Sequence, residues 1–500
     1  MGLAKLYSRA LSGVTAELVT VEVHVSGGLP SFSIVGLPDT EVKESRDRVR
    51  SAIQNSGFDF PARRITVNLA PADLPKDSGR YDLPIALGVL IASGLIKGKI
   101  NTNSLEFAGE LALDGMLRKI TGALAIAYSA KNNQRGFILP TESANEASLV
   151  SDCEVYAANS LREVILHVTG ESALNKMILP QQLENIFDYK LDIAEVKGQI
   201  GAKKALEIAA SGRHSIIMVG APGCGKSMLA QRFVTILPPL CEEDALEIAS
   251  LYSLSYSGFN LDLFGKIPFR QPHHSSSSVA IVGGGANPKP GEISLAHLGV
   301  LFLDEMPEFA RNVLEVLREP LETKKINIAR AHRRVEFPAD FQLVAAMNPC
   351  PCGFFGHDEK ICKCSMEQIS KYRAKISAPL LDRIDLVVEL PHLKTEELTS
   401  LKKGENSNLV RERVIGARNR QLSRQNKLNY ALNVEEIEEY CVLDNGAKSL
   451  LQQITTKMGL SARSYHRVLK VARTVADTEN KDIITASDIA QVMQYKKMYD

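Results

Sequence analysis

The feature that most constrains this chain is a glycine-rich loop that follows a short apolar run. Residues 215–219, with the sequence SIIMV, lead into the pattern GxxxxGKS, which ends in Lys226 and Ser227. In such a loop the glycines expose backbone N–H groups to phosphates, the lysine reaches the β- and γ-phosphate oxygens, and the serine hydroxyl ligates Mg²⁺. We therefore predict a strand, a triphosphate-binding loop and a helix. The loop consists of Gly220, Ala221, Pro222, Gly223, Cys224, Gly225, Lys226 and Ser227.

Two further apolar runs end in polar residues. Residues 299–303 precede Asp304 and Glu305, and residues 341–347 precede Asn348. A buried strand that ends in two acids suits a site in which Asp304 holds Mg²⁺ through water and Glu305 polarises the attacking water. Asn348 is predicted to orient that water if its strand lies between the other two; the alternative is an asparagine that begins an ordinary turn.

The length and composition indicate a multidomain globular protein. A chain of 500 residues is too long for one core, and its 45% hydrophobic and 23% charged residues are ordinary for a folded protein. The apolar periodicity weakens around Pro180, and the pattern becomes helical after Pro391. We predict an N-terminal domain over residues 1–170, a linker over 171–191, a core over 192–390 and a helical lid over 391–500.

The periodicity predicts an α/β fold. Runs of β-branched residues indicate strands at 18–25 and 65–69, and spaced apolar residues indicate a helix at 40–55. In the core, strands at 215–219, 299–303 and 341–347 alternate with helices at 201–210 and 309–321, which is typical of a parallel sheet covered on both faces. In the lid, Asn433 with Glu436 and Thr485 with Asp488 have the spacing of capping boxes, for two of about four helices.

The sequence favours a cytoplasmic protein with no membrane partner. The N-terminus has no continuous apolar signal core, and the longest mostly apolar run, residues 83–96, is too short to span a bilayer. The net charge of +1 means that a nucleic-acid-binding surface would have to be local.

Several long stretches resemble one family of AAA+ ATPases. They are GLPDTEVKESRDRVRSAI, FRQPHHSSSSVAIVGGGANPKPGEISLAHLGVLFLDEMPEF, NPCPCGFFGH, SAPLLDRIDLVVEL and SARSYHRVLKVARTVAD. The chain resembles, over essentially its whole length, the bacterial ComM/YifB family, magnesium-chelatase-like members of the helix-2-insert and pre-sensor-1 branch. The resemblance implies a AAA+ P-loop core with a parallel sheet, an all-α lid, and ATP with Mg²⁺ as cofactors.

The resemblance also assigns roles that spacing alone does not give. Val196 and Gln199 match the adenine-side motif, Arg383 matches the arginine finger offered to a neighbouring subunit, and Arg463 matches the lid arginine called sensor 2. A finger that acts on a neighbour requires a ring, so the resemblance implies a homo-oligomer, expected to be a hexamer. From bare sequence, a salt bridge within the lid is the alternative for either arginine.

Two segments are candidates for loops that grip a substrate in the pore of a ring. Residues 275–291 are rich in serine and glycine and correspond to the helix-2 insert. Residues 324–334, KKINIARAHRR, correspond to the pre-sensor-1 hairpin and contain no acid. Its cations are candidates for tracking a DNA backbone, although a charge run is more often a solvated face. They are Lys324, Lys325, Arg330, Arg333 and Arg334. A second basic stretch, residues 411–427, is expected to be a solvated face or a subunit contact, with DNA contact as the less favoured alternative.

Four of the eight cysteines fall within one short window. Cys350, Cys352, Cys362 and Cys364 offer enough thiolates for a closed tetrahedral Zn²⁺ site. Their C-x-C spacing departs from the commoner C-x₂-C, and His357 lies between the pairs as a substitute ligand. We predict structural zinc, with reduced free cysteines as the alternative.

Residues 60–140 resemble the catalytic domain of Lon proteases, an α+β fold like domain 2 of ribosomal protein S5. An active site of that kind needs a serine nucleophile and a lysine that accepts its proton. Here the nucleophile position falls on or next to Tyr81 and Asp82, and the lysine position falls within the apolar run 123–127. Ser78 and Lys76 lie nearby in the wrong register. We therefore predict an ATPase that is not a protease, with this domain as a scaffold.

The resemblance implies a ring-forming ATPase that drives branch migration of DNA recombination intermediates in natural transformation. Single-stranded or branched DNA and recombination proteins are the partners this implies. The alternative is a remodeller that acts on a protein partner, as in the magnesium chelatase motor subunit. DNA ranks first because that motor is expected to lack the N-terminal domain and the cysteine-rich insertion.

Overall fold

The computed structural model divides the chain into two compact units. Unit 1 comprises residues 1–184 and 241–265, and unit 2 comprises residues 185–240 and 266–500. The structure describes residues 2–97, 100, 102–178, 189–285, 288–330, 333–357, 360–392 and 404–496. Residues 179–188, nearly half of the predicted linker, lie outside this part. The sequence-based division differs at residues 241–265, which it assigned to the core and which the structure groups with unit 1.

Unit 1 is built on a mixed sheet. In its described residues the strand order is β3-β4-β2-β1-β5-β8-β9, with β1, β2 and β4 antiparallel and β5, β8 and β9 parallel to β1 or to one another. β2 alternates buried valines with more exposed residues, as the β-branched run predicts. The strands are β1 (Gly2–Ser12), β2 (Thr15–Ser26), β3 (Ser31–Val35), β4 (Arg64–Ala70), β5 (Leu105–Phe107), β8 (Gly136–Pro140) and β9 (Val155–Ala158); β6 (Glu110–Leu111) and β7 (Leu117–Arg118) pair separately.

Helices pack against this sheet. α1 (Thr40–Asn55) has the predicted bounds and begins where the Asp39 side chain accepts a bond from the Val42 amide. α2 (Asp82–Ser93) packs on β1 and β2. Residues 241–265, which belong to unit 1, contribute α8 (Glu242–Leu254). Its Leu246 and Ala249 join the apolar cluster around α3. The remaining helices are α3 (Ala123–Ala130), α4 (Thr141–Ala147) and α5 (Leu161–Thr169).

The described part of unit 2 contains a parallel sheet in the order β11-β14-β17-β10-β18. Its three central strands, β14, β17 and β10, are wholly buried, which explains their continuous apolar runs. The α/β prediction is confirmed, with strands within one residue of the predicted bounds in the core. They are β11 (Phe269–Arg270), β14 (Val300–Leu303), β17 (Gln342–Met347), β10 (Ile216–Gly220) and β18 (Leu386–Leu390).

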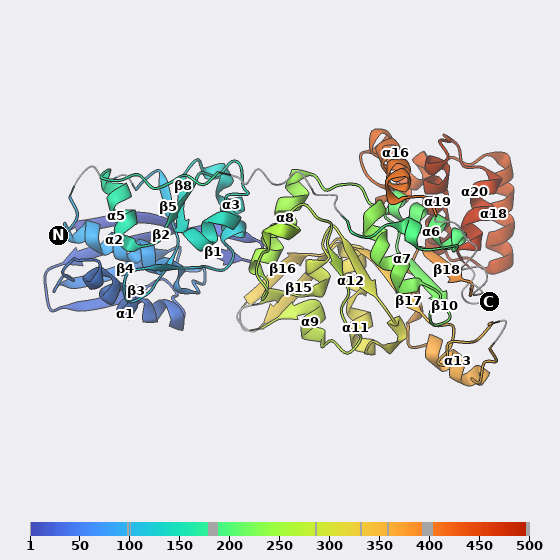
Figure 1. The fold of residues 1–500 in the computed structure, drawn as a ribbon, viewed down its shortest axis with the longest axis horizontal. Helices are drawn as coiled ribbons and strands as arrows, with labels where there is room; N and C mark the ends of the chain where they lie inside the picture. The colour runs from blue at the N-terminus through green and yellow to red at the C-terminus, as the bar shows by residue number, and fades with distance from the viewer. Residues whose placement is uncertain are drawn as a thin grey trace. The chain divides into compact units, whose positions relative to one another are not determined.

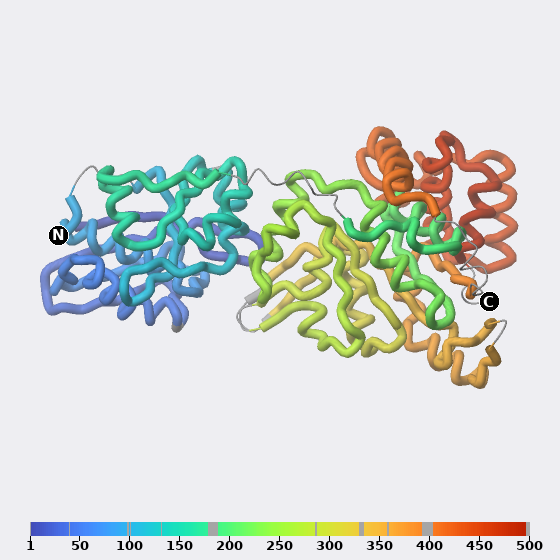
Figure 2. Tube along the Cα trace, in the orientation of Figure 1, coloured from blue at the N-terminus to red at the C-terminus, as the bar shows by residue number. Residues whose placement is uncertain are grey.

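Helices of unit 2 pack beside the sheet and form the predicted helical region after it. α6 (Ile200–Gly212) contacts β18, α16 (Ser407–Gln425) and α19 (Ala462–Thr478). The later helices gather into one group (Figure 1), and Figure 2 follows the chain through them in orange and red. Within residues 404–496 there are five α-helices instead of about four; the others are α17 (Val434–Tyr440), α18 (Asn445–Met458) and α20 (Ala486–Gln494). Both predicted capping boxes are confirmed, at α17 and α20.

One predicted helix is divided. The sequence indicated a single helix at 309–321, whereas the structure has α11 (Arg311–Val316) and α12 (Arg318–Thr323). Pro320 explains the break, because its missing N–H cannot bond to the carbonyl one turn earlier. Shorter elements of unit 2 are α7 (Lys226–Phe233), α9 (Ser278–Val282), α10 (Glu292–Leu295), α13 (Met366–Arg373), α14 (Ala378–Leu381), and the hairpins β12 (Gly283–Gly284) with β13 (Lys289–Pro290) and β15 (Lys325–Arg330) with β16 (Arg333–Pro338).

Across the described ranges, no helix is both long and apolar enough to cross a lipid bilayer.

A buried ion pair joins β1 to β5 inside unit 1. Arg9 donates to both carboxylate oxygens of Glu106, at 2.7 Å and 3.1 Å, and to the carbonyl of Ala16 at 2.8 Å. The side chains of Arg9 and Glu106 are 4% and 0% exposed. Such a pair is costly to break, because the remaining charge stays buried without its main partner.

We predict that Arg9→Met lowers the free energy of unfolding of unit 1 by about 3–5 kcal/mol. The matched control is Lys5→Met, which removes a surface ion pair to Glu22 and is expected to cost less than about 1 kcal/mol. Hydrogen exchange of unit 1 peptides in increasing urea measures both. Equal effects of the two substitutions would contradict the role given to the buried pair.

Candidate functional site

The phosphate loop connects β10 to α7 as the sequence predicts. β10 ends at Gly220, and α7 begins at Lys226. Gly223 and Gly225 have φ angles of 82° and 97°, in the left-handed region that glycine adopts without strain. The loop therefore turns tightly into the positive end of a helix, where backbone N–H groups can bind an anion.

The Lys226 ammonium lies in the mouth of this loop. Its Nζ donates to the carbonyls of Gly220 at 2.7 Å and Ala221 at 3.0 Å, and to Oδ1 of Asn348 at 3.2 Å. β17 lies between β10 and β14, so the condition stated for Asn348 is met, and its amide reaches the loop. Phosphate oxygens can replace the carbonyls as acceptors without a large movement of the lysine.

The predicted magnesium ligands face each other. Ser227 Oγ donates to Oδ2 of Asp304 at 2.7 Å. The other oxygen of Asp304 accepts from the Glu305 amide at 3.0 Å, which orients the carboxylate. A hydroxyl and a carboxylate beside a phosphate loop fit Mg²⁺, which takes few protein ligands and completes its octahedron with water and phosphate oxygens.

Glu305 occupies an unusual backbone position beside a histidine. Its φ is 50°, and its side chain is 55% exposed. Nδ1 of His274 lies 3.6 Å from Oε2 of Glu305. His274 was not among the predicted site residues. Its signal in the sequence is a pair of adjacent histidines just after β11, the strand that pairs with β14, and Glu305 lies two residues beyond the end of β14.

The predicted adenine-side segment lies against the phosphate loop. Gln199 is buried, and its Nε2 donates to the carbonyls of Cys224 at 3.0 Å and Pro391 at 2.9 Å. The carbonyl of the buried Val196 accepts from Lys203. The segment thus links the loop to the end of β18, and its contact with a base stays a prediction.

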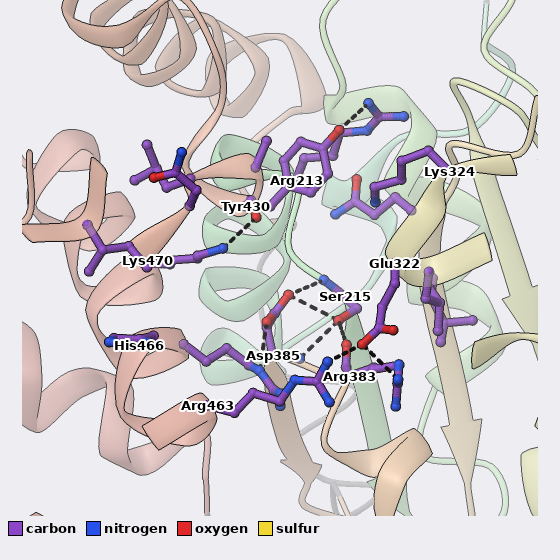
Figure 3. Close-up of a pocket in the computed structure, with 18 of the residues that line it drawn as sticks. Arg213, Ser215, Glu322, Lys324, Arg383, Asp385, Tyr430, Arg463, His466 and Lys470 are labelled. Atoms are coloured by element: carbon purple, nitrogen blue, oxygen red, sulfur yellow. Dashed lines mark hydrogen bonds and ion pairs between the residues drawn. The ribbon is translucent and has the colours of Figure 1, made fainter. Parts of the chain in front are cut away.

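Arg383 and Arg463 meet in a different place, a pocket of about 570 Å³ (Figure 3). Both guanidiniums pair with Glu322 of α12, Arg383 at 2.7 Å. Burial opposes ionisation of Glu322, but the hydrogen bond and charge of Arg383 outweigh it, so the pKa of Glu322 is lowered. The alternative predicted for either arginine was a salt bridge within the lid. Both arginines do form salt bridges, but their partner Glu322 belongs to the core. Glu322 itself was not foreseen.

This pocket lies at the opposite sheet edge from the phosphate loop. Arg383 precedes β18, whose Leu386 pairs with Ile216, whereas the loop follows Gly220, which pairs with Leu390. A strand of this length separates its two ends by roughly 13 Å. Within one chain, the two arginines therefore lie at the opposite end of the strands from the phosphate loop.

The predicted DNA-binding cations are only partly described. Lys324 is not on the hairpin: it follows α12, lies 3.3 Å from a carboxylate oxygen of Asp340 and sits over the Tyr430 ring. Lys325 begins β15 and pairs with Glu336 at 2.7 Å. The side chains of Arg330, Arg333 and Arg334 lie outside the described part, as do residues 286–287 of the serine- and glycine-rich segment.

The expectation of a solvated face at residues 411–427 is wrong for most of its cations. Arg413 pairs with Glu207 at 2.8 Å and with Glu405. Arg424 pairs with the fully buried Asp477 at 2.7 Å, and Arg418 donates to the Ala210 carbonyl. These bonds tie α16 to α6 and α19.

The four cysteines of the insertion lie together. Their ligand atoms are within 4.8 Å of one another, with Sγ separations of 3.4, 3.7 and 3.6 Å among Cys350, Cys352 and Cys362. Four sulfurs about 2.3 Å from a tetrahedral Zn²⁺ would lie about 3.8 Å apart, so the cluster fits the ion. Backbone N–H groups of Phe354 and Lys363 lower the pKa of the Cys352 thiol to about 6, which favours a thiolate. His357, the substitute ligand, instead accepts from the Lys360 amide through Nδ1.

The predicted position of the Lon nucleophile, on or next to Tyr81 and Asp82, contains a buried carboxylate. Asp82 is 0% exposed and accepts hydrogen bonds from Ser45, from Nε of Arg48 at 2.6 Å and from the Leu111 amide at 3.2 Å. Burial raises the pKa of Asp82. The position of the Lon lysine lies in α3, where residues 123–127 are fully buried and apolar.

The parallel sheet, the phosphate loop and the acids beside it define a P-loop ATPase of the AAA+ class. Family models described as "Magnesium chelatase, subunit ChlI", "Subunit ChlI of Mg-chelatase" and "Magnesium chelatase, subunit ChlI C-terminal" match residues 192–398, 21–143 and 404–496. The second match lies in unit 1, so that unit does not by itself separate this chain from chelatase subunits.

Relatives match the chain from end to end. Competence protein ComM of Haemophilus influenzae is 46% identical over 100% of this chain and 98% of its own length. YifB of Salmonella typhimurium is 46% identical over 99% and 97%. Lon protease 2 of Bacillus subtilis is 25% identical over 31% of this chain and 32% of its own. The chain belongs to the ComM/YifB family of magnesium-chelatase-like AAA+ ATPases.

We predict that Lys226→Ala abolishes nucleotide binding, whereas Glu305→Gln keeps it and slows hydrolysis by about 10²- to 10⁴-fold, because a general base is lost. Binding of a fluorescent ATP analogue and phosphate release measure the two effects. The control is Glu308→Gln, three residues further on, which removes a surface pair to Lys375 and should leave turnover unchanged. Normal turnover by Glu305→Gln would refute its assignment as the base.

Proposed function

We propose that this chain is a ring-forming, Mg²⁺-ATP-driven DNA motor that promotes branch migration of recombination intermediates in natural transformation. The observation that supports the DNA part most is the end-to-end similarity to a protein named for competence. Competence is the capacity to take up DNA, and a AAA+ ring that threads a strand can move a DNA branch point. We propose the cytoplasm as its location, with recombination proteins as further partners.

The geometry of unit 2 supports assembly into a ring. Arg383 and Arg463 are gathered at the sheet edge opposite the phosphate loop. In a head-to-tail ring this edge of one protomer faces the nucleotide of the next. A guanidinium that reaches a γ-phosphate neutralises charge in the transition state and accelerates hydrolysis by about 10³-fold or more. We propose a hexamer in which each nucleotide is completed by the neighbouring protomer.

The β15–β16 hairpin is the proposed DNA contact. The backbones of Arg330 and Arg333 are partners at the end of the hairpin, and Arg334 follows Arg333 along β16. One copy would be a weak site, but several copies around a pore would focus positive potential on the axis. Lys325 also belongs to this hairpin, whereas Lys324 belongs to the pocket with Tyr430 and is not proposed as a DNA contact.

The cysteine cluster is proposed to hold a structural Zn²⁺. Its sulfur separations and the amide that donates to Cys350 Sγ from Phe355, at 3.3 Å, suit a closed thiolate site. Unit 1 is proposed as a scaffold and not a protease, because the Asp82 carboxylate is fully engaged where a nucleophile would be required.

A remodeller of a protein partner is the second candidate function. The descriptions of the matching family models favour it, since each names a magnesium chelatase subunit. The two functions differ in whether DNA affects the ATPase. A DNA motor is expected to hydrolyse ATP faster with single-stranded or branched DNA and to displace strands from a four-way junction. The absence of stimulation by any DNA would favour the remodeller.

We predict that the double variant Arg333→Glu, Arg334→Glu weakens DNA binding and reduces its salt dependence, because phosphate contacts are lost. Basal ATPase activity is expected to stay unchanged. The control is Lys448→Glu, Lys457→Glu, an equal change of charge at exposed positions of α18. Fluorescence anisotropy with labelled DNA at several salt concentrations measures both. Unchanged affinity of the hairpin variant would place the DNA site elsewhere.

A further inference from the structure

The cysteine cluster adjoins the nucleotide site through a short stretch of chain. Cys350 comes two residues after Asn348, whose side chain bonds to Lys226 in the phosphate loop. Cys350 is fully buried, and the turn that follows it closes with a bond from the Gly353 amide to the Cys350 carbonyl at 3.0 Å. One cysteine of the four-sulfur cluster is therefore only two residues along the chain from Asn348, whose side chain contacts the phosphate loop.

A second contact joins the same turn to the loop directly. Gly353 has a φ of 83° and packs against Pro222. A Cβ placed on Gly353 would lie 2.5 Å from Cδ and 2.8 Å from Cγ of Pro222, closer than real side chains approach. Pro222 lies between the glycines that shape the loop, so the position of Gly353 limits where the loop can lie.

The turn is held from its other side by α13. Nε of Arg373 donates to the carbonyl of Pro349 at 3.3 Å, and its guanidinium lies 5.5 Å from the centre of the Phe355 ring. The chain between Asn348 and Phe355 is thus held by α13 on one side and the phosphate loop on another. The sulfur cluster is a further attachment, in which Cys350 and Cys352 meet the distant Cys362 and Cys364.

We propose that a zinc-class divalent cation held by the four thiolates fixes this turn against Pro222, so that nucleotide affinity depends on occupancy of the metal site. The inference rests on the zinc site proposed above and adds its effect on the phosphate loop. Ligation joins two segments ten residues apart and limits the positions open to the turn. Without the metal, the turn that carries Gly353 loses one of the restraints that hold it at the loop, and ATP binds less tightly.

The test compares variants of the full chain by metal content and by affinity for a fluorescent ATP analogue. The double variant Cys362→Ser, Cys364→Ser is expected to lose the bound zinc and to bind the nucleotide about tenfold or more weakly, because small displacements of positioning groups have effects of this order. Cys241→Ser is the control, since this exposed thiol lies outside the cluster and a serine also suits its place before α8. Chelation of the wild type followed by added Zn²⁺ should lower and then restore the affinity.

A second variant, Gly353→Ala, tests the contact between the turn and the phosphate loop without removing a metal ligand. It should keep the zinc and still weaken nucleotide binding, because its Cβ would push against Pro222. If the cysteine variant fails to fold, chelation of the wild type followed by added Zn²⁺ decides whether the metal affects the affinity. Unchanged nucleotide affinity in Gly353→Ala, or in a folded cysteine variant that has lost zinc, would overturn the coupling and leave the zinc site intact. A wild-type chain that binds no zinc would overturn both the site and the inference.

Discussion

The parallel register of β10 between β17 and β18 is the constraint on which the rest of unit 2 depends. Ile216 pairs with Val344 and Leu386, so the carboxyl ends of the three strands lie level to within one residue. Their carboxyl ends bring Lys226 to Asn348, and Asp304 on the next strand to Ser227. Their amino ends place Arg383 beside Glu322 and Arg463. One sheet thus separates phosphate binding from the arginines that are expected to complete it.

The opposite edge of the sheet is stabilised by charges that are paired within the chain. Glu322 pairs with two guanidiniums, and Asp340 accepts from Arg213 and Tyr430, which line the same pocket. Such pairs already restrict these long side chains within one chain. The side chains therefore lose less rotamer entropy when they bind a neighbouring protomer. If the neighbouring nucleotide takes over these arginines, its phosphates replace the carboxylate of Glu322 as the anionic partner. The pocket in a single chain is therefore suited to hold the arginines until that exchange.

Local chemistry explains how much of this was predictable from sequence. The strands of the core and the capping boxes at Asn433 and Thr485 follow from patterns within a few residues. The grouping of Ser227 with Asp304 was predictable because each follows a predicted strand of one parallel sheet, and parallel strands bring their carboxyl ends to the same edge. The division of the helix at Leu317 was not predicted, because the apolar periodicity continues across it, whereas Pro320 interrupts the hydrogen bonds of the helix. The internal partners of the cations in α16, the addition of α8 to unit 1, and the joint pairing of Arg383 and Arg463 depend on residues far apart in sequence. No local pattern contains that information.

The central claim is that each nucleotide is completed by an arginine from another protomer. The most direct test co-expresses Lys226→Ala and Arg383→Ala chains with different tags and measures ATP hydrolysis by the mixed assemblies. Each variant alone is expected to be inactive, whereas random mixing pairs an intact loop with an intact arginine at roughly a quarter of the head-to-tail interfaces. The account predicts that the mixture recovers activity. A mixture as inactive as its components, or full activity of Arg383→Ala alone, would contradict it.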